Sequence, residues 1–129
     1  MLDRLAFRAA ALAVALLAAG APGTAQDYAV ASPLDDLEGL ARVIGGAHKI
    51  RQLCDSNDQT WRDQMLALID IEALGDDRRQ RGMIDAFNDG FRIQERQHSR
   101  CNADARRAES ELATEGRRLA EALRDRYLN

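Results

Sequence analysis

The chain has 129 residues, with 18 lysines and arginines against 21 aspartates and glutamates, so its formal net charge is −3 at pH 7. The basic side chains are scattered among acidic ones instead of gathering in one segment, which argues against a nucleic-acid-binding protein. A chain of this length is expected to form one domain with a modest core, and beyond residue 25 it has no apolar run long enough to span a bilayer.

Residues 1–25 have the pattern of a secretory signal peptide. Two arginines precede an uncharged run of mostly Ala, Leu and Val over residues 9–19, and small residues follow at 23–25, where cleavage is predicted. A membrane anchor is the alternative, but the run is shorter than the roughly 20 residues that a span requires. We therefore expect a periplasmic protein that begins at Gln26 and has no stable membrane insertion after the signal is removed.

The mature chain is expected to consist of a flexible segment over residues 26–32 and a helical domain over residues 33–129. Ser32 and Pro33 have the character of an N-cap and a first helical position, so the first helix should begin there and end near Cys54. Apolar residues recur along it at steps of three and four, which predicts one broad buried face. The members of this face are Leu37, Leu40, Val43, Ile44, Ala47, Ile50 and Cys54.

Two further helices are predicted after polar turns. Thr60 follows a run of turn formers and can cap a short second helix, and Asp76 or Asp77 can cap a third helix that continues toward Ser99. The predicted inner stripes are Trp61, Met65, Leu68 and Ile69 in the second helix, and Met83, Ile84, Phe87, Phe91 and Gln94 in the third.

A last helix begins after Asn102, which can cap it, and reaches Tyr127. Its inner stripe consists of Ala105, Ala108, Leu112, Leu119 and Leu123. No segment alternates with the period of two that a half-buried strand requires. The sequence therefore predicts an all-α, four-helix bundle-like domain.

The two cysteines are expected to form a disulfide between helices. An even number of cysteines in an exported protein indicates a disulfide, and this chain allows only one intramolecular pairing. Cys54 lies at the end of the first predicted helix and Cys101 just before the last. The bond would join these two helix ends and stabilise the fold by about 4 kcal/mol in the chain-entropy model.

Several glycines lie inside the predicted helices, where each costs about 0.5–1 kcal/mol relative to alanine. They are Gly39, Gly45, Gly46, Gly82, Gly90 and Gly116. Close crossing of helix backbones is the favoured explanation, and a kink or the close approach of a ligand is the alternative. Asn88 and Asp89 before Gly90 also form a turn signal that could split the third helix.

No catalytic residue, metal site or cofactor is predicted. The sequence has no G-x-S-x-G, H-E-x-x-H or C-x-x-C-H motif, so a cell-wall hydrolase that uses His48 or Glu95 is the least favoured function. A zinc site made of both histidines and both cysteines is conceivable. However, only His98 and Cys101 have the close spacing typical of zinc ligands.

The remaining candidate residues suit recognition. Trp61 is expected to fill the gap between the first two helices or, if it is partly exposed beside Arg62, to act as a binding hot spot. His48 is expected at the edge of the core, hydrogen-bonded to a neighbouring helix. The candidate binding surface comprises His48, Trp61, Arg62, Asn88 and Arg92. We predict a binding or adaptor module for an envelope protein or cell-wall component, with an envelope-stress chaperone or a metal-binding protein as the alternative.

Short groups of residues between Leu37 and Leu123 indicate a family. They are Leu40-Ala41-Arg42-Val43-Ile44-Gly45 with His48, Leu53-Cys54, Trp61-Arg62 with Met65, Phe87-Asn88 with Gly90-Phe91-Arg92, Cys101, Glu115-Gly116 and Leu119-Ala120. In these groups the chain resembles a family of small exported alphaproteobacterial proteins of unknown function. The resemblance implies a two-cysteine helical domain, and it implies no activity, cofactor or catalytic residue.

Overall fold

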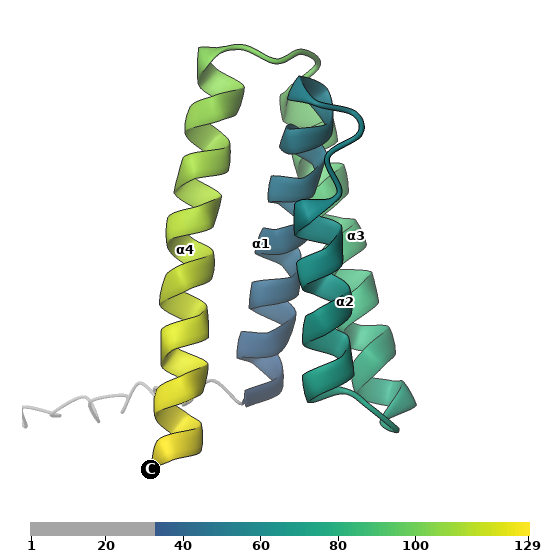
Figure 1. Cartoon of the computed structure of the whole chain (residues 1–129), viewed down its shortest axis with the longest axis vertical. Helices are drawn as coiled ribbons and strands as arrows, with labels where there is room; N and C mark the ends of the chain where they lie inside the picture. The colour runs from purple at the N-terminus through teal and green to yellow at the C-terminus, as the bar shows by residue number, and fades with distance from the viewer. Residues whose placement is uncertain (1–32) are drawn as a thin grey trace, which may run out of the picture.

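The computed structural model describes residues 33–129, which form four helices and no strand. The helices are α1 (Pro33–Cys54), α2 (Thr60–Glu72), α3 (Asp77–Gln97) and α4 (Ala103–Leu128). Successive helices run in opposite directions, as Figure 1 shows. The predicted four-helix, all-α fold is confirmed, whereas the predicted signal peptide and the segment over residues 26–32 lie outside the described residues.

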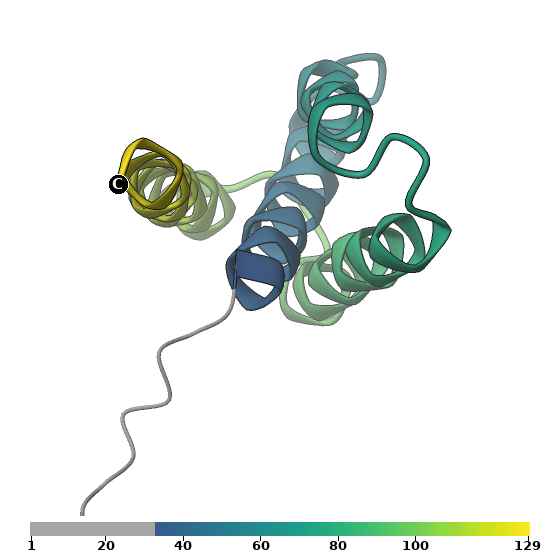
Figure 2. The same ribbon diagram turned by 90° about the horizontal axis from the view of Figure 1, so that it is seen from below.

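Helix α1 lies in the middle of the fold. It packs against each of the other three helices, and the view along the helices in Figure 2 shows them arranged around it. A helix with neighbours on three sides must be apolar over most of its surface. Its buried apolar residues are Leu37, Leu40, Ala41, Val43, Ile44, Ala47 and Ile50. They include every position predicted for its buried face except Cys54, which is exposed because it lies at the end of the helix, in the disulfide.

Glycines allow α1 and α3 to approach each other closely. A Cβ atom on Gly45 would lie 1.9 Å from the Phe87 carbonyl oxygen, and one on Gly90 would lie 1.8 Å from the Arg42 carbonyl oxygen. Only a residue without a side chain fits at these two positions. The explanation by close helix crossing is therefore confirmed here, and α3 continues without a break through Gly90.

The burial of α3 differs from the predicted stripe at one position. Met83, Ala86 and Gly90 face α1 and are buried, whereas Ile84 remains 40% exposed. Because the glycine crossing brings the Ala86 and Gly90 side of α3 against α1, Ile84 is turned to the margin of this interface. It faces the space between α2 and α3, where it lines a groove.

Two of the predicted helix caps are confirmed. The side chain of Asp76 accepts a hydrogen bond of 2.9 Å from the backbone N–H of Arg79, and the side chain of Asn102 accepts one of 2.9 Å from the backbone N–H of Ala105. Each satisfies a donor that the first turn of the helix leaves unpaired. Before α3, Gly75 has a φ of 76°, which a residue with a side chain rarely adopts.

The predicted cap of α2 is wrong. Thr60 is the first residue of the helix, and the side chain of Gln59, which occupies the N-cap position, makes no capping hydrogen bond. Asp58 instead accepts a hydrogen bond of 2.9 Å from the backbone N–H of Thr60, and the hydrogen bonds from Thr60 lower the pKa of Asp58. Arg51 of α1 lies 3.1 Å from the same carboxylate, so a contact to α1 and a turn together fix where α2 begins.

The predicted disulfide joins Cys54 and Cys101, whose Cα atoms are 5.0 Å apart. It closes a loop with a sequence separation of 47 residues and connects the end of α1 to the start of α4. At the opposite end of the molecule the Tyr127 hydroxyl donates a hydrogen bond of 2.7 Å to Glu72 of α2. Helix α4 is thus attached to the rest of the fold at both of its ends.

Candidate functional site

The structure does not place all the predicted binding residues together. Arg62 and Asn88 line a groove between α2 and α3, while Trp61 faces the other side of α2 and lines a second cleft. His48 is buried on α1, and Arg92 is exposed on α3 and lies 3.3 Å from Asp89. Trp61 and Arg62 belong to α2, which forms one wall of each hollow, whereas His48 and Arg92 line neither of them.

The α2–α3 groove has a volume of about 300 Å³ and is mainly apolar. Its lining residues are Arg62, Met65, Leu66, Ile69, Asp70, Gln80, Ile84, Phe87 and Asn88. Leu66 on one wall is 47% exposed and Ile84 on the other is 40% exposed. Apolar side chains facing each other across an open groove are a feature of interaction sites.

Polar groups at the edge of this groove are available for contacts. Within residues 33–129, neither the guanidinium of Arg62 nor the amide of Asn88 takes part in an ion pair or hydrogen bond. Asp70 lies two helical turns after Arg62 on the same wall, about 12 Å along α2. The groove therefore presents a positive group toward one end and a negative group toward the other.

His48 supports the groove from beneath instead of lining it. Its side chain is only 4% exposed, and its ring centroid lies 5.8 Å from that of Phe87 and 6.1 Å from that of Phe91. The expected hydrogen bond to a neighbouring helix is not found at Nδ1, which is buried without a partner. Burial, and next the positive charge of Arg62, lower the pKa of His48, so the imidazole is neutral at pH 7.

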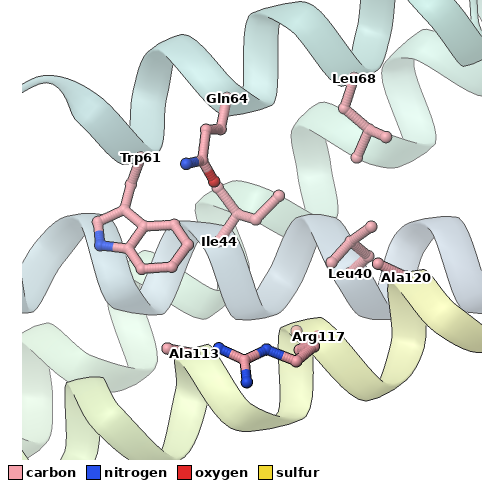
Figure 3. Close-up of a pocket in the computed structure, with 9 residues that line it drawn as sticks. Leu40, Ile44, Trp61, Gln64, Leu68, Ala113, Arg117 and Ala120 are labelled. Carbon is pink, nitrogen blue, oxygen red and sulfur yellow. The ribbon is translucent and has the colours of Figure 1, made fainter.

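Trp61 lies in a second hollow, the α2–α4 cleft, which has a volume of about 310 Å³ and α1 as its floor (Figure 3). The indole packs against the core, as predicted, and its N–H also donates a hydrogen bond of 3.0 Å to Glu109 of α4. The same carboxylate accepts a hydrogen bond of 2.7 Å from Arg51 of α1. Glu109 therefore connects three helices near the disulfide.

Sequence reasoning did not identify Glu109 or its role. Its partners are separated from it by 48 residues (Trp61) and 58 residues (Arg51), and a helical repeat reveals only neighbours three or four residues apart. In the sequence, Glu109 is one of many acidic residues on a solvated helix. Only the packing of α4 beside α2 brings it to the indole.

The geometry offers no arrangement for a zinc ion among the described residues. The sulfurs of Cys54 and Cys101 are bonded to each other and are therefore not thiolate ligands. Residues 33–129 contain no group of three or more His, Cys, Asp or Glu side chains placed to hold a metal ion. None of the four helices is both long enough and apolar enough to cross a membrane.

A family model described as "Protein of unknown function (DUF2385)" matches residues 33–127. The chain belongs to the DUF2385 family. The matched region includes both cysteines, the glycine crossing and both hollows beside α2. No curated protein and no solved structure matches the chain. The DUF2385 match confirms the resemblance to a family of unknown function, so a functional proposal has to come from the geometry of the helices.

Proposed function

We propose that the protein is an exported, periplasmic binding module that holds an amphipathic helix of an envelope protein in the α2–α3 groove. The observation that carries the proposal is the exposure of Leu66 and Ile84 on facing walls of this groove, beside the unpaired guanidinium of Arg62. Two helices with apolar residues between them form the usual receptor for a third helix.

Helix α2 has more apolar surface than the fold covers. Met65 and Ile69 are buried, whereas Leu66 is 47% exposed and Ile71 is 77% exposed. A short helix that is apolar on several sides is normally covered by neighbours. Here α1 covers one side only, so a partner helix that covered Leu66 would bury more of the apolar surface of α2.

The charges along the groove indicate how a partner would be oriented. Arg62 and Asp70 lie about 12 Å apart along α2. A partner helix with an acidic residue near Arg62 and a basic residue two turns away, near Asp70, complements both charges. Charge complementarity of this kind fixes the direction and the register of a bound helix more than its affinity.

Export is part of the proposal and is supported by two features. A disulfide persists in oxidising compartments and is rare in the cytosol, and the N-terminal residues have the signal-peptide pattern. Cell fractionation with intact-mass measurement tests this part. We expect a periplasmic species that begins at Gln26 and carries the intact disulfide. A species recovered in the cytosol with its N-terminus retained would contradict export.

Site-specific photo-crosslinking in cells tests the groove. The full chain is expressed with a benzoylphenylalanine replacing Leu66 in the groove or, as a control, Leu128, which is 76% exposed and lies outside it. We expect one discrete protein adduct from the groove position, none of the same mass from the control, and loss of that adduct when Arg62→Glu is added. Peptide mapping of the adduct should locate the link on an amphipathic helix with the expected charges.

The other occupants of the groove give different results in this experiment. A chaperone would yield a broad ladder of adducts that Arg62→Glu does not remove, because unfolded clients share no charge pattern. Adducts containing glycan alone would indicate a cell-wall ligand. Either result, or equal labelling from both positions, would refute the helix-binding proposal.

A further inference from the structure

The α2–α4 cleft is separate from the α2–α3 groove and has a different character. Leu40 and Ile44 of α1 form its floor, and Trp61 and Leu68 contribute apolar surface from α2. The wall on α4 is made of the small residues Ala113, Gly116 and Ala120, with Arg117 beside them, and Gln64 completes the lining from α2. Figure 3 shows these walls with an open space between them.

The cleft is bounded at both ends by contacts between α2 and α4. Toward the disulfide, Trp61 donates its hydrogen bond to Glu109, and toward the C-terminus Tyr127 donates its hydrogen bond to Glu72. Between these two contacts the helices are held apart, and side chains as small as those of the α4 wall leave the space between them open. The α2–α4 cleft is therefore a slot bounded by these two contacts, and it fits a narrow ligand.

Arg117 is the charged residue that lines this slot. Its neighbour Arg118 is paired with Glu115, but within residues 33–129 no carboxylate or hydrogen-bond acceptor is recorded for Arg117. A guanidinium at the edge of an apolar slot complements a ligand that has an apolar body and an anionic head. The amide of Gln64 on the opposite wall can donate a hydrogen bond to the same head.

We propose that the α2–α4 cleft binds a single alkyl chain that ends in a carboxylate, with the chain along Leu40, Ile44 and Trp61 and the carboxylate at Arg117. The wall from Ala113 to Ala120 is about 10 Å long, which accommodates roughly eight extended methylenes. The proposed ligand is a free alkyl carboxylate and not the surface of a lipid bilayer. Contacts between α2 and α4 bound the slot at both ends, and the formal charge of the chain, −3, opposes binding to an anionic membrane surface.

Trp61 provides the readout, because it is the only tryptophan of the chain and lines the cleft. The full protein as recovered from cells is titrated with alkyl carboxylates of increasing length, each below its micelle concentration, while tryptophan fluorescence is recorded. We expect affinity to rise about fourfold per methylene up to roughly eight carbons and then to level off. A carboxylate brominated on its chain should quench the fluorescence by contact with the indole.

Variants of α4 test the head and the chain separately. Arg117→Gln should weaken carboxylate binding about tenfold, Arg117→Lys should retain most of it, and neither should change the binding of a neutral alkyl glucoside. Ala120→Phe should block both ligands, because the added ring fills the slot. Arg106→Gln, an exposed change on α4 outside the cleft, is the matched control and should leave the affinity unaltered.

Three results would overturn the proposal. The first is equal affinity for alkyl carboxylates, neutral glucosides and alkyl trimethylammonium ions, and the second is an affinity that does not depend on chain length. The third is co-sedimentation with phosphatidylglycerol vesicles without a fluorescence response to free carboxylates, which would identify a bilayer surface as the ligand. None of these results affects helix binding in the α2–α3 groove, which involves neither Arg117 nor Ala120.

Discussion

Replacing Gly90 with alanine tests how closely α1 and α3 must pack. The new Cβ would lie 1.8 Å from the Arg42 carbonyl oxygen, so the two backbones would have to separate by about 1.2 Å to restore a contact of 3.0 Å. A backbone carbonyl inside a helix cannot rotate away as a side chain can. We therefore expect Gly90→Ala to lower the free energy of unfolding by about 3 kcal/mol, at the upper end of the usual overpacking cost. This loss exceeds the gain of up to about 1 kcal/mol that alanine brings to a helix.

Thermal and urea unfolding followed by circular dichroism measure this effect. A loss of about 3 kcal/mol should lower the melting temperature by at least about 12 °C in a domain of this size. Gly39→Ala is the matched control on α1, because its Cβ would meet Leu119 at an ordinary 3.6 Å. That variant should be more stable than the parent by about 0.5–1 kcal/mol. If Gly90→Ala unfolds within 1 kcal/mol of the parent, the close crossing does not exist.

Three further changes probe the disulfide, the buried histidine and the link between helices. Replacing Cys54 and Cys101 with alanine should lower the free energy of unfolding by about 4 kcal/mol in urea, and persistent sensitivity of this variant to reductant would count against the disulfide. Burial lowers the pKa of His48, so the unfolded chain binds the proton more readily, and stability should fall as pH drops below about 6.5. His48→Leu should flatten this part of the pH profile, and an unchanged slope would show that another group titrates there. Glu109→Gln should lower stability by about 1–3 kcal/mol and shift the emission of Trp61; unchanged emission would mean that the indole does not contact this residue.

The parts of the fold that could be predicted from sequence are those that local patterns encode. Helical periodicity located the buried face of α1, and the polar residues Asp76 and Asn102 marked the starts of α3 and α4. The disulfide followed from chemistry and chain order, since a chain with two cysteines has only one intramolecular pairing. Each of these inferences needs only neighbouring residues or a small number of alternatives.

The parts that sequence could not give depend on how the helices are placed around α1. A period of three to four residues assigns Ile84 to the inner stripe, but the glycine crossing rotates it to the edge of a groove. Thr60 has the character of a cap, yet Asp58 takes over because it also reaches Arg51. The two hollows beside α2 lie between helices that are packed together in the fold. Local sequence patterns predict the helices but not the spaces between them.

The central position of α1 has a consequence for how the chain becomes a folded domain. Helix α1 is the first of the four helices in residues 33–129, and the other three cover it. Part of its apolar surface therefore stays in contact with water until α4 has packed against it. A fragment that lacks α4 would leave the side of α1 that packs against α4 exposed to water. Truncation within α4 should therefore destabilise the whole domain, because it exposes apolar residues of α1 at the centre of the fold.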